Sequence, residues 1–366
     1  MPIEFAQRIN RIPVYPVASG YDLGAEVAML ASNESCFGPL PAVVDAAAGV
    51  LAGTHRYPDP GYAPLRRALS ERYGVPQERI AVGNGSCDIL LAAGEALLEP
   101  GAEVVYAWPA FSVYPHLAAA SGARAIEVPL DGDERHDLDA IAREITVTTR
   151  LVLICNPNNP TSTAWGLDAI EAFLQRVPSH VCVILDEAYC EFALSLGDTY
   201  ASIDLLRRHP NLVLLRTFSK VYGLAGLRVG YALCGSPDFR VAVDQVRQPF
   251  YLNAAAQAAA VEALRHQDEV ERRVGFTIAA RLELERGVRA LGLWAAESDA
   301  NFIWLRLGAE IDEAAVLGGL RERGVLVRAG GSLGRPGALR VTVGTDPENA
   351  RFLAGLQALC HNPASA

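Results

Sequence analysis

A single lysine is the most informative residue in the sequence for chemistry. Of the 32 lysine and arginine residues in the chain, only Lys220 is a lysine. A coding bias toward arginine explains why surface lysines are absent, because a solvated positive charge tolerates either side chain. This bias does not explain why a lysine is retained at position 220. An amine that must lose its proton to attack a carbonyl cannot be replaced by a guanidinium group, so Lys220 is a candidate nucleophile, with chance survival at a permissive position as the alternative.

Polar residues that can join this lysine follow short apolar runs. Asn159 follows the run RLVLIC, Asp186 ends VCVILD with Tyr189 shortly after it, and Ser219 and Lys220 follow NLVLLRTF. The intervals between these groups leave room for one helix-containing crossover each. Since the carboxyl ends of parallel strands lie at one edge of a sheet, we expect these side chains to converge there.

An amine, a carboxylate, an amide and a phenol in one place fit the chemistry of pyridoxal phosphate. A lysine amine forms a Schiff base with an aldehyde, and this cofactor is the common biological aldehyde that also needs a carboxylate at its ring nitrogen. Asp186 can supply that carboxylate and keep the nitrogen protonated. Asn159 and Tyr189 can donate hydrogen bonds to the phenolic oxygen of the ring. The sequence therefore predicts a pyridoxal phosphate site with Lys220 as its covalent attachment.

The phosphate of that cofactor needs an anion site. VGNGSCDIL follows a predicted strand and opens a helix with Gly85 and Ser86, so its backbone amides can form an anion-binding nest. Ser219 and Arg228 add a hydroxyl group and a fixed cation. A glycine turn alone is weak evidence, and a methyltransferase that uses GNGS to bind a nucleotide is the alternative. That alternative gives Lys220 no role.

Alternating strands and helices must position these residues. The predicted strands are 80–83, 103–107, 125–130, 150–155, 181–186, 211–218 and 228–234. The predicted helices between them are 86–98, 111–121, 137–145, 166–177 and 236–248. Continuous apolar strands that alternate with helices indicate an α/β fold with a mainly parallel sheet covered on both faces.

A second, smaller α/β domain is expected in the C-terminal part. Helical sequence rich in alanine and arginine fills 254–290, and later elements are strands at 301–307, 324–328 and 339–344 and helices at 311–323 and 347–360. A length of 366 residues fits two domains. We predict an N-terminal segment, 1–40, that joins the smaller domain, a large cofactor-binding domain, 41–250, and a small C-terminal domain, 251–366.

Composition and charge exclude several other classes of protein. Apolar residues make up 51% and charged residues 20% of the chain, which favours packed domains over disorder. The formal charge of −10 argues against nucleic acid and anionic membranes as partners. The sequence shows no secretory signal and no apolar span of membrane length, so we expect a cytoplasmic protein. The cysteine and histidine spacings predict no metal site.

Several motifs together resemble the histidinol-phosphate aminotransferase family. They are GNGS, HRYPDP, CNPNNPT, LDEAY and RTFSKVYGLAGLRVGYA. This family is a branch of the fold-type I, aspartate-aminotransferase-like pyridoxal phosphate enzymes, and the resemblance extends from SNESCFGP to LRVTVGTDPEN. It implies a large domain with a mainly parallel central sheet, a smaller α/β domain, and a homodimer with shared active sites.

The resemblance gives individual residues their expected roles. The implied cofactor contacts are Lys220 at the aldehyde, Asp186 at the ring nitrogen, Asn159 and Tyr189 at the ring oxygen, and Gly85, Ser86, Ser219 and Arg228 at the phosphate. Phe111 matches an aromatic residue that stacks on the cofactor, with plain core packing as the alternative. Tyr57 matches a tyrosine that reaches the phosphate from the neighbouring subunit, and the alternative is a turn residue before Pro58.

The resemblance also implies how substrate is recognised. Arg340 matches the arginine that holds the anionic end of the substrate, since a planar guanidinium group binds a carboxylate or a phosphate through two hydrogen bonds. Arg328 and Tyr15 resemble further anion ligands of the histidinol-phosphate enzymes. Asn33, in LASNES, is another substrate-binding candidate.

Different motifs resemble enzymes that act on two different kinds of amino donor. VRQPFYLN and VRAGGSLGRPGALRVTVG are closer to histidinol-phosphate enzymes, whereas NPNNPTST, LASNES and AWPAF resemble actinobacterial aromatic amino acid aminotransferases of the same family. The favoured reaction converts L-histidinol phosphate and 2-oxoglutarate to imidazole acetol phosphate and L-glutamate, in histidine biosynthesis. The alternatives are a phenylalanine or tyrosine aminotransferase, a phosphoamino-acid decarboxylase of similar fold, and a non-catalytic regulatory protein on a transaminase fold.

One position departs from the family pattern. The common NPTG ending is Asn159-Pro160-Thr161-Ser162 here, with serine in place of glycine. We therefore expect that the turn after Thr161 does not require a backbone angle open only to glycine.

Overall fold

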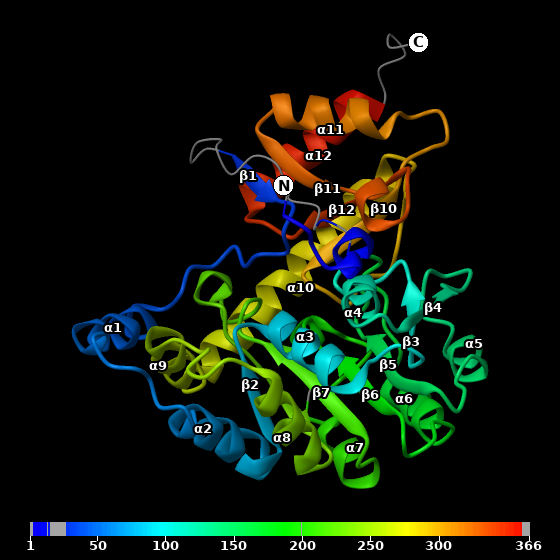
Figure 1. Cartoon of the computed structure of the whole chain (residues 1–366). Coiled ribbons are helices and arrows are strands. Elements are labelled where there is room, and N and C mark those ends of the chain that lie inside the picture. The colour runs from blue at the N-terminus through cyan, green and yellow to red at the C-terminus, as the bar shows by residue number, and fades with distance from the viewer. Residues whose placement is uncertain (1–2, 13, 15–26, 199, 361–366) are drawn as a thin grey trace.

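Two β-sheets with helices packed against them organise the chain. The computed structural model describes residues 3–12, 14, 27–198 and 200–360. In the view of Figure 1 the smaller sheet lies above the larger one. The helices in these ranges include none that is both long enough and apolar enough to cross a membrane.

The larger sheet contains the strands that carry most of the candidate site. Its strands are β2 (Ile80–Gly83), β3 (Glu103–Trp108), β4 (Arg124–Pro129), β5 (Thr149–Cys155), β6 (Cys182–Asp186), β7 (Leu212–Thr217) and β8 (Gly230–Cys234). Their order is β2-β8-β7-β6-β5-β3-β4, and only β8 runs antiparallel to its neighbours. The prediction of a mainly parallel sheet is confirmed, and each predicted strand matches within two residues at either end.

Burial on both faces explains why these strands read as continuous apolar runs. Every residue of β7 and β8 is buried. Successive side chains of a strand point to opposite faces, so Leu214 belongs to one hydrophobic core and Leu215 to the other. Both faces therefore need apolar residues, as expected for a sheet with helices on each side.

Helices cover the larger sheet on its two faces. The predicted helices are confirmed as α3 (Ser86–Leu97), α4 (Tyr114–Ser121), α5 (Leu138–Arg143), α6 (Leu167–Leu174) and α8 (Pro237–Val246). Helices α3, α4 and α8 contribute to one core, while α5, α6 and α9 (Ala254–Ala263) contribute to the other. The sequence did not predict α1 (Pro41–Gly49), α2 (Ala63–Tyr73) or α7 (Ile203–Arg208). Short 3-10 helices occur at Gln7–Arg11, Leu51–Gly53, Gln77–Arg79, Cys190–Phe192, Ala225–Leu227 and Gly331–Leu333.

The smaller sheet combines both ends of the described chain. Its strands are β1 (Ala28–Leu30), β9 (Trp294–Ala295), β10 (Phe302–Arg306), β11 (Val325–Ala329) and β12 (Ala338–Thr342), in the order β1-β11-β12-β10-β9. β1 pairs parallel with β11, and the other pairs are antiparallel. Helices α10 (Gln267–Ala290), α11 (Glu313–Glu322) and α12 (Asp346–Cys360) share its core. The domain boundaries at 41 and 251 stay predictions.

A buried glutamate joins the two halves of the molecule. Glu134 lies between β4 and α5 and accepts hydrogen bonds from the side chains of Trp304 and Arg306 on β10. Arg335, in the loop between β11 and β12, lies 3.3 Å from the same carboxylate. The backbone of this loop is therefore tied to the larger sheet close to the cavity described next.

Candidate active site

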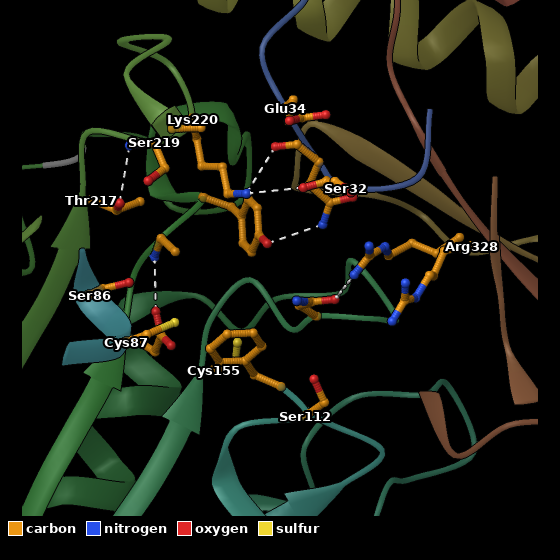
Figure 2. A pocket seen from close by; sticks show the side chains of 18 of the residues that line it. Ser32, Glu34, Ser86, Cys87, Ser112, Cys155, Thr217, Ser219, Lys220 and Arg328 are labelled. Atoms are coloured by element: carbon orange, nitrogen blue, oxygen red, sulfur yellow. Dashed lines mark hydrogen bonds between the residues drawn. The ribbon is translucent and has the colours of Figure 1, made fainter. Parts of the chain in front are cut away.

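A cavity of about 410 Å³ lies where the carboxyl ends of β5, β6 and β7 face β11 and β12. Most of the residues predicted for the site line it: Asn33, Ser86, Phe111, Asn159, Asp186, Tyr189, Ser219, Lys220, Arg228, Arg328 and Arg340. Figure 2 shows Lys220 and Ser219 on one side of this cavity and Arg328 on another. The predicted convergence at one edge of the larger sheet is therefore observed.

Lys220 points its amine into the cavity. Its Nζ donates hydrogen bonds to the backbone oxygens of Asn33, at 3.0 Å, and Ser32, at 3.4 Å (Figure 2). The pKa of Lys220 is lowered to about 8, mainly by burial and also by the positive charge of Arg340. A larger fraction of this amine is therefore unprotonated near neutral pH than of an exposed lysine, as a nucleophile requires.

Asp186 presents a buried carboxylate at the end of β6. Its side chain is only 3% exposed. Oδ1 accepts a hydrogen bond from the amide of Ala188 at 3.2 Å, and Oδ2 accepts one from the hydroxyl of Tyr114 at 3.1 Å. The pKa of Asp186 is raised to about 6, because the effect of burial outweighs that of these two hydrogen bonds, which favour the ionised form. A cation beside this carboxylate would favour its ionised form.

The amide and the phenol of the predicted site are held by Arg340, on β12 of the smaller sheet, and by Asn33, which follows β1. Oδ1 of Asn159 accepts a hydrogen bond from Arg340 at 2.6 Å, so Nδ2 is the donor that Asn159 can present to a ligand. The hydroxyl of Tyr189 accepts a hydrogen bond from Asn33 at 3.1 Å. Burial raises the pKa of Tyr189, so this hydroxyl keeps its proton at neutral pH and can donate it.

The predicted phosphate ligands form a compact cradle before α3. Gly85 has a φ of +84°, and a Cβ at this position would collide with the guanidinium group of Arg228. Ser86 is the first residue of the 12-residue helix α3, whose N-terminal amides and dipole favour an anion. Nη1 of Arg228 donates to the backbone oxygen of Ala225 at 2.8 Å and approaches Oγ of Ser219 at 3.4 Å.

The two predicted aromatic contacts lie in different places. Phe111 lines the cavity, is half-buried, and meets Tyr114 edge-to-face at 5.8 Å between ring centroids. Tyr57 is 80% exposed and stacks on Phe250 at 4.4 Å. It does not line the cavity of its own chain. Tyr15 lies outside the residues that the structure describes.

Two arginines form the wall of the cavity that belongs to the smaller sheet. Arg328 on β11 and Arg340 on β12 are register partners, so both side chains leave the sheet on the same face. Their exposed fractions are 9% and 7%. Nη2 of Arg340 also donates to the backbone oxygen of Ala31 at 2.6 Å. Two guanidinium groups are therefore concentrated on one side of the site.

The expectation for Ser162 is wrong. Ser162 has a φ of +61°, in the left-handed region that favours glycine, and it is fully buried. Its amide donates to the oxygen of Asn158 at 2.8 Å, and its own oxygen accepts from the amide of Asp299 at 2.8 Å. These two hydrogen bonds hold the backbone of Ser162 on both sides. Its Oγ donates to the oxygen of Thr161 at 2.6 Å, a contact that glycine lacks.

A buried hydrogen-bond network fixes the loop that carries Asn159. The side chain of Asn158 donates to Thr161 at 2.8 Å and to the backbone oxygen of Pro109 at 3.2 Å. Its Oδ1 lies 3.0 Å from Nε2 of His136. Burial lowers the pKa of His136 to about 4, so the ring is neutral and Nε2 carries the donated proton.

The fold and the site together define a class of enzyme, the fold-type I aminotransferases that use pyridoxal phosphate. The family model "Aminotransferase class I and II" matches residues 25–356. The chain therefore belongs to the class I and II aminotransferase family, and the resemblance inferred from its motifs is confirmed. This family membership argues against the methyltransferase alternative.

The named relatives include both kinds of enzyme that the motifs resemble. Histidinol-phosphate aminotransferase 2 of Ralstonia nicotianae is 44% identical over 357 residues, covering 97% of this chain and 95% of that protein. An aromatic amino acid aminotransferase of Thermobifida fusca is 46% identical over 327 residues, covering 89% and 88%. The structure is similar to that of histidinol-phosphate aminotransferase from Sinorhizobium meliloti in complex with pyridoxal-5'-phosphate, with a TM-score of 0.85, 30% identity and 97% of each chain covered.

Proposed function

We propose that the cavity binds pyridoxal phosphate with Lys220 as its attachment. The residues present fit the cofactor in three respects. The N-terminus of α3 with Arg228 suits a phosphate dianion, the buried carboxylate of Asp186 suits a protonated ring nitrogen, and an amine of lowered pKa suits attack on an aldehyde. When bound, the cofactor supplies the aldehyde that accepts and returns the amino group and a ring that withdraws electrons from the reacting carbon.

The chain's own residues perform the remaining tasks. With a substrate bound, Lys220 would move a proton at the reacting carbon, and the backbone oxygens of Ser32 and Asn33 can hold its Nζ within the cavity. The donors of Asn159 and Tyr189 orient the ring through its phenolic oxygen. The roles proposed for the other contacts are phosphate binding by Gly85, Ser86, Ser219 and Arg228 and stacking by Phe111.

We also propose a homodimer in which Tyr57 serves the neighbouring active site. Its exposed ring and its position outside its own cavity support this arrangement. The proposed reaction uses small metabolites, so we place the enzyme in the cytoplasm, without nucleic acid or membrane partners.

The amino donor proposed is L-histidinol phosphate, and the acceptor is 2-oxoglutarate. The reaction gives imidazole acetol phosphate and L-glutamate, a step of histidine biosynthesis. The observation that carries this choice is the pair Arg328 and Arg340, which line the cavity together. A phosphate dianion has enough oxygens to bind both guanidinium groups, and the two carboxylates of 2-oxoglutarate can use the same pair.

An aromatic amino acid is the second candidate donor. Leu333 and Phe111 supply apolar surface to the same cavity, and the identity to the Thermobifida fusca enzyme is of the same size as that to the histidinol-phosphate enzyme. In this case the aromatic ring of the donor would lie near Arg328, whose charge it would not neutralise. This difference makes Arg328 the residue on which the two donors can be separated.

Single-turnover measurements distinguish the donors. The cofactor-loaded enzyme is mixed with L-histidinol phosphate, L-phenylalanine or L-tyrosine, and the visible spectrum is followed. We expect the highest efficiency for L-histidinol phosphate, and a loss of about 10- to 100-fold for that donor alone in Arg328→Gln, because a hydrogen bond to a charged group contributes ~1.5–3 kcal/mol.

Arg335→Gln is the matched control, since Arg335 lies in the adjacent loop and contacts Glu134 without lining the cavity. If L-histidinol phosphate leaves the spectrum unchanged while an aromatic donor converts it, the proposed donor is wrong. Release of carbon dioxide in place of a 2-oxo product would instead favour the decarboxylase alternative. A spectrum that responds to no donor would favour the regulatory protein.

A further inference from the structure

A buried tyrosine outside the expected cofactor contacts touches the most important carboxylate of the site. The hydroxyl of Tyr114, on α4, lies 3.1 Å from Oδ2 of Asp186, on β6. Tyr114 has no exposed surface and does not line the cavity. Tyr114 is therefore not a direct contact of a bound cofactor, but its hydroxyl can influence the cofactor through Asp186.

The direction of this hydrogen bond follows from the chemistry of its partners. An ionised carboxylate can only accept, so the hydroxyl of Tyr114 must donate. The other oxygen of Asp186 accepts from the backbone amide of Ala188 at 3.2 Å. Both oxygens are thus bonded on the protein side, and each bond favours the charged form over the protonated form.

The packing of Tyr114 gives its hydroxyl a fixed position. Proline follows it at the second residue of α4, and its amide donates to the oxygen of Phe111 at 2.9 Å. Its ring meets those of Phe111 and Tyr106 edge-to-face, at 5.8 and 5.9 Å between centroids. Such contacts restrict the ring to one orientation. The hydroxyl is therefore held in place before any cofactor binds.

We propose that Tyr114 is a positioning residue that keeps Asp186 ionised and oriented, so that the proton shared with the cofactor resides on the ring nitrogen. This inference rests on the proposed binding of pyridoxal phosphate. Without the donated hydrogen bond, Asp186 is a stronger base and draws the proton toward itself. A ring that loses this proton is a weaker electron acceptor, so the hydroxyl of Tyr114 also sets the rate of proton removal from the substrate.

Other ionisable groups around Asp186 do not substitute for Tyr114. The charge of Glu187, the residue after β6, disfavours ionisation of the carboxylate, and the charge of Lys220, beyond β7, favours it. Cys87, Cys155 and Tyr189 also lie near Asp186, and burial raises the pKa of each, so these groups are neutral. Lys220 would no longer be a free ammonium group if it were attached to the cofactor. In the loaded enzyme the hydroxyl of Tyr114 and the amide of Ala188 would remain the hydrogen bonds that the protein donates to this anion.

The test compares two variants that each lose one buried hydroxyl. Tyr114→Phe keeps the ring and its packing, and Tyr106→Phe is the matched control, because the hydroxyl of Tyr106 donates to Glu127 at 3.0 Å, away from the cavity. Each protein is loaded with pyridoxal phosphate carrying nitrogen-15 in its ring. The chemical shift of the ring nitrogen and the dissociation constant of the cofactor are measured, and circular dichroism verifies the fold.

We expect Tyr114→Phe to move the nitrogen shift toward the unprotonated value and to weaken cofactor binding about tenfold, which is ~1.4 kcal/mol. Tyr106→Phe should match the wild type in both measurements. In an Asp186→Ala background the Tyr114→Phe change should have no further effect on cofactor affinity, since its route of action is gone. A purely structural role would instead give the same loss in both backgrounds.

The inference is overturned if Tyr114→Phe and Tyr106→Phe give the same nitrogen shift and affinity, or if the losses add independently of Asp186. Failure of the wild-type protein to bind the cofactor would refute the proposed function itself and the inference with it. The two failures are distinguished by the wild-type titration alone.

Discussion

The glycine at position 85 offers a test of the phosphate cradle that separates backbone strain from binding. Gly85 has φ +84° and ψ 164°, a region that is essentially restricted to glycine. In Gly85→Ala the strain costs ~1–3 kcal/mol of the free energy of unfolding. The new Cβ also meets the guanidinium group of Arg228, which must move away. Arg228 would then lose the hydrogen bonds to the phosphate that we propose for it.

The expected loss of affinity for the cofactor follows from those lost contacts. Hydrogen bonds to a charged group contribute ~1.5–3 kcal/mol, so the dissociation constant of pyridoxal phosphate should rise about 10- to 100-fold. Urea unfolding of the cofactor-free protein measures the strain, and titration of the visible absorption band measures the affinity.

Gly74→Ala supplies the control. Gly74 ends α2 with a φ of +65°, and a Cβ there would meet no atom within 4 Å. It should lose ~1 kcal/mol of stability through its left-handed backbone and keep its cofactor affinity. If Gly85→Ala binds the cofactor as tightly as Gly74→Ala does, the assignment of Gly85 and Arg228 to a phosphate cradle is refuted.

Three further outcomes follow from buried groups. In urea unfolding, Ser162→Gly should be more stable than Ser162→Ala by ~1 kcal/mol, because alanine keeps the strain of the left-handed backbone angle. Equal stabilities of the two variants would contradict this, since they would show that the turn relaxes. Glu134→Ala should lose ~2 kcal/mol, since it leaves the indole N–H of Trp304 buried without its acceptor, and an unchanged unfolding midpoint would contradict this. Because the pKa of Lys220 is lowered from 10.5 to about 8, the unfolded chain binds more protons between these values. The unfolding free energy of the cofactor-free protein should therefore rise with pH from about 8 to 10.5, relative to Lys220→Met, and a parallel pH profile would contradict it.

The larger sheet could be predicted because its strands are buried on both faces. The first four residues of β7, from Leu212 to Leu215, alternate between two buried faces and are all apolar. A continuous apolar run of this kind between helices can be recognised in one sequence. β1 has only three residues and pairs with a strand almost 300 positions away, as Ala28 does with Val325. α7 has six residues, too few to show a helical period. These elements depend on tertiary contacts that leave little local pattern.

The residues of the site also divide into those that the sequence could predict and those that depend on tertiary contacts. Asp186, Asn159 and Lys220 could be found because each lies at or shortly beyond the carboxyl end of a parallel strand. The oxygens that hold Lys220 are backbone atoms 187 and 188 positions away, and every residue type supplies such an atom. Tyr114 contacts Asp186 across 72 positions, and nothing in the start of a helix identifies that partner.

Ser162 shows why a substitution can mislead. The presence of serine suggested a relaxed turn, yet the backbone is held at a positive φ by hydrogen bonds to Asn158 and from Asp299. The contacts around the residue decide the angle, and the serine tolerates it. One sequence records which residue is present but not the strain that it bears.

Borohydride reduction followed by peptide mass spectrometry tests the central claim most directly. The chain has one lysine, so its only primary amines are Lys220 and the N-terminal amino group. After loading with pyridoxal phosphate and reduction, the reduced cofactor should be found covalently bound to the peptide that contains Lys220, and Lys220→Ala should hold no covalent cofactor in this region. A cofactor that separates from the reduced wild-type protein on denaturation, or that is attached at the N-terminus, would contradict the account.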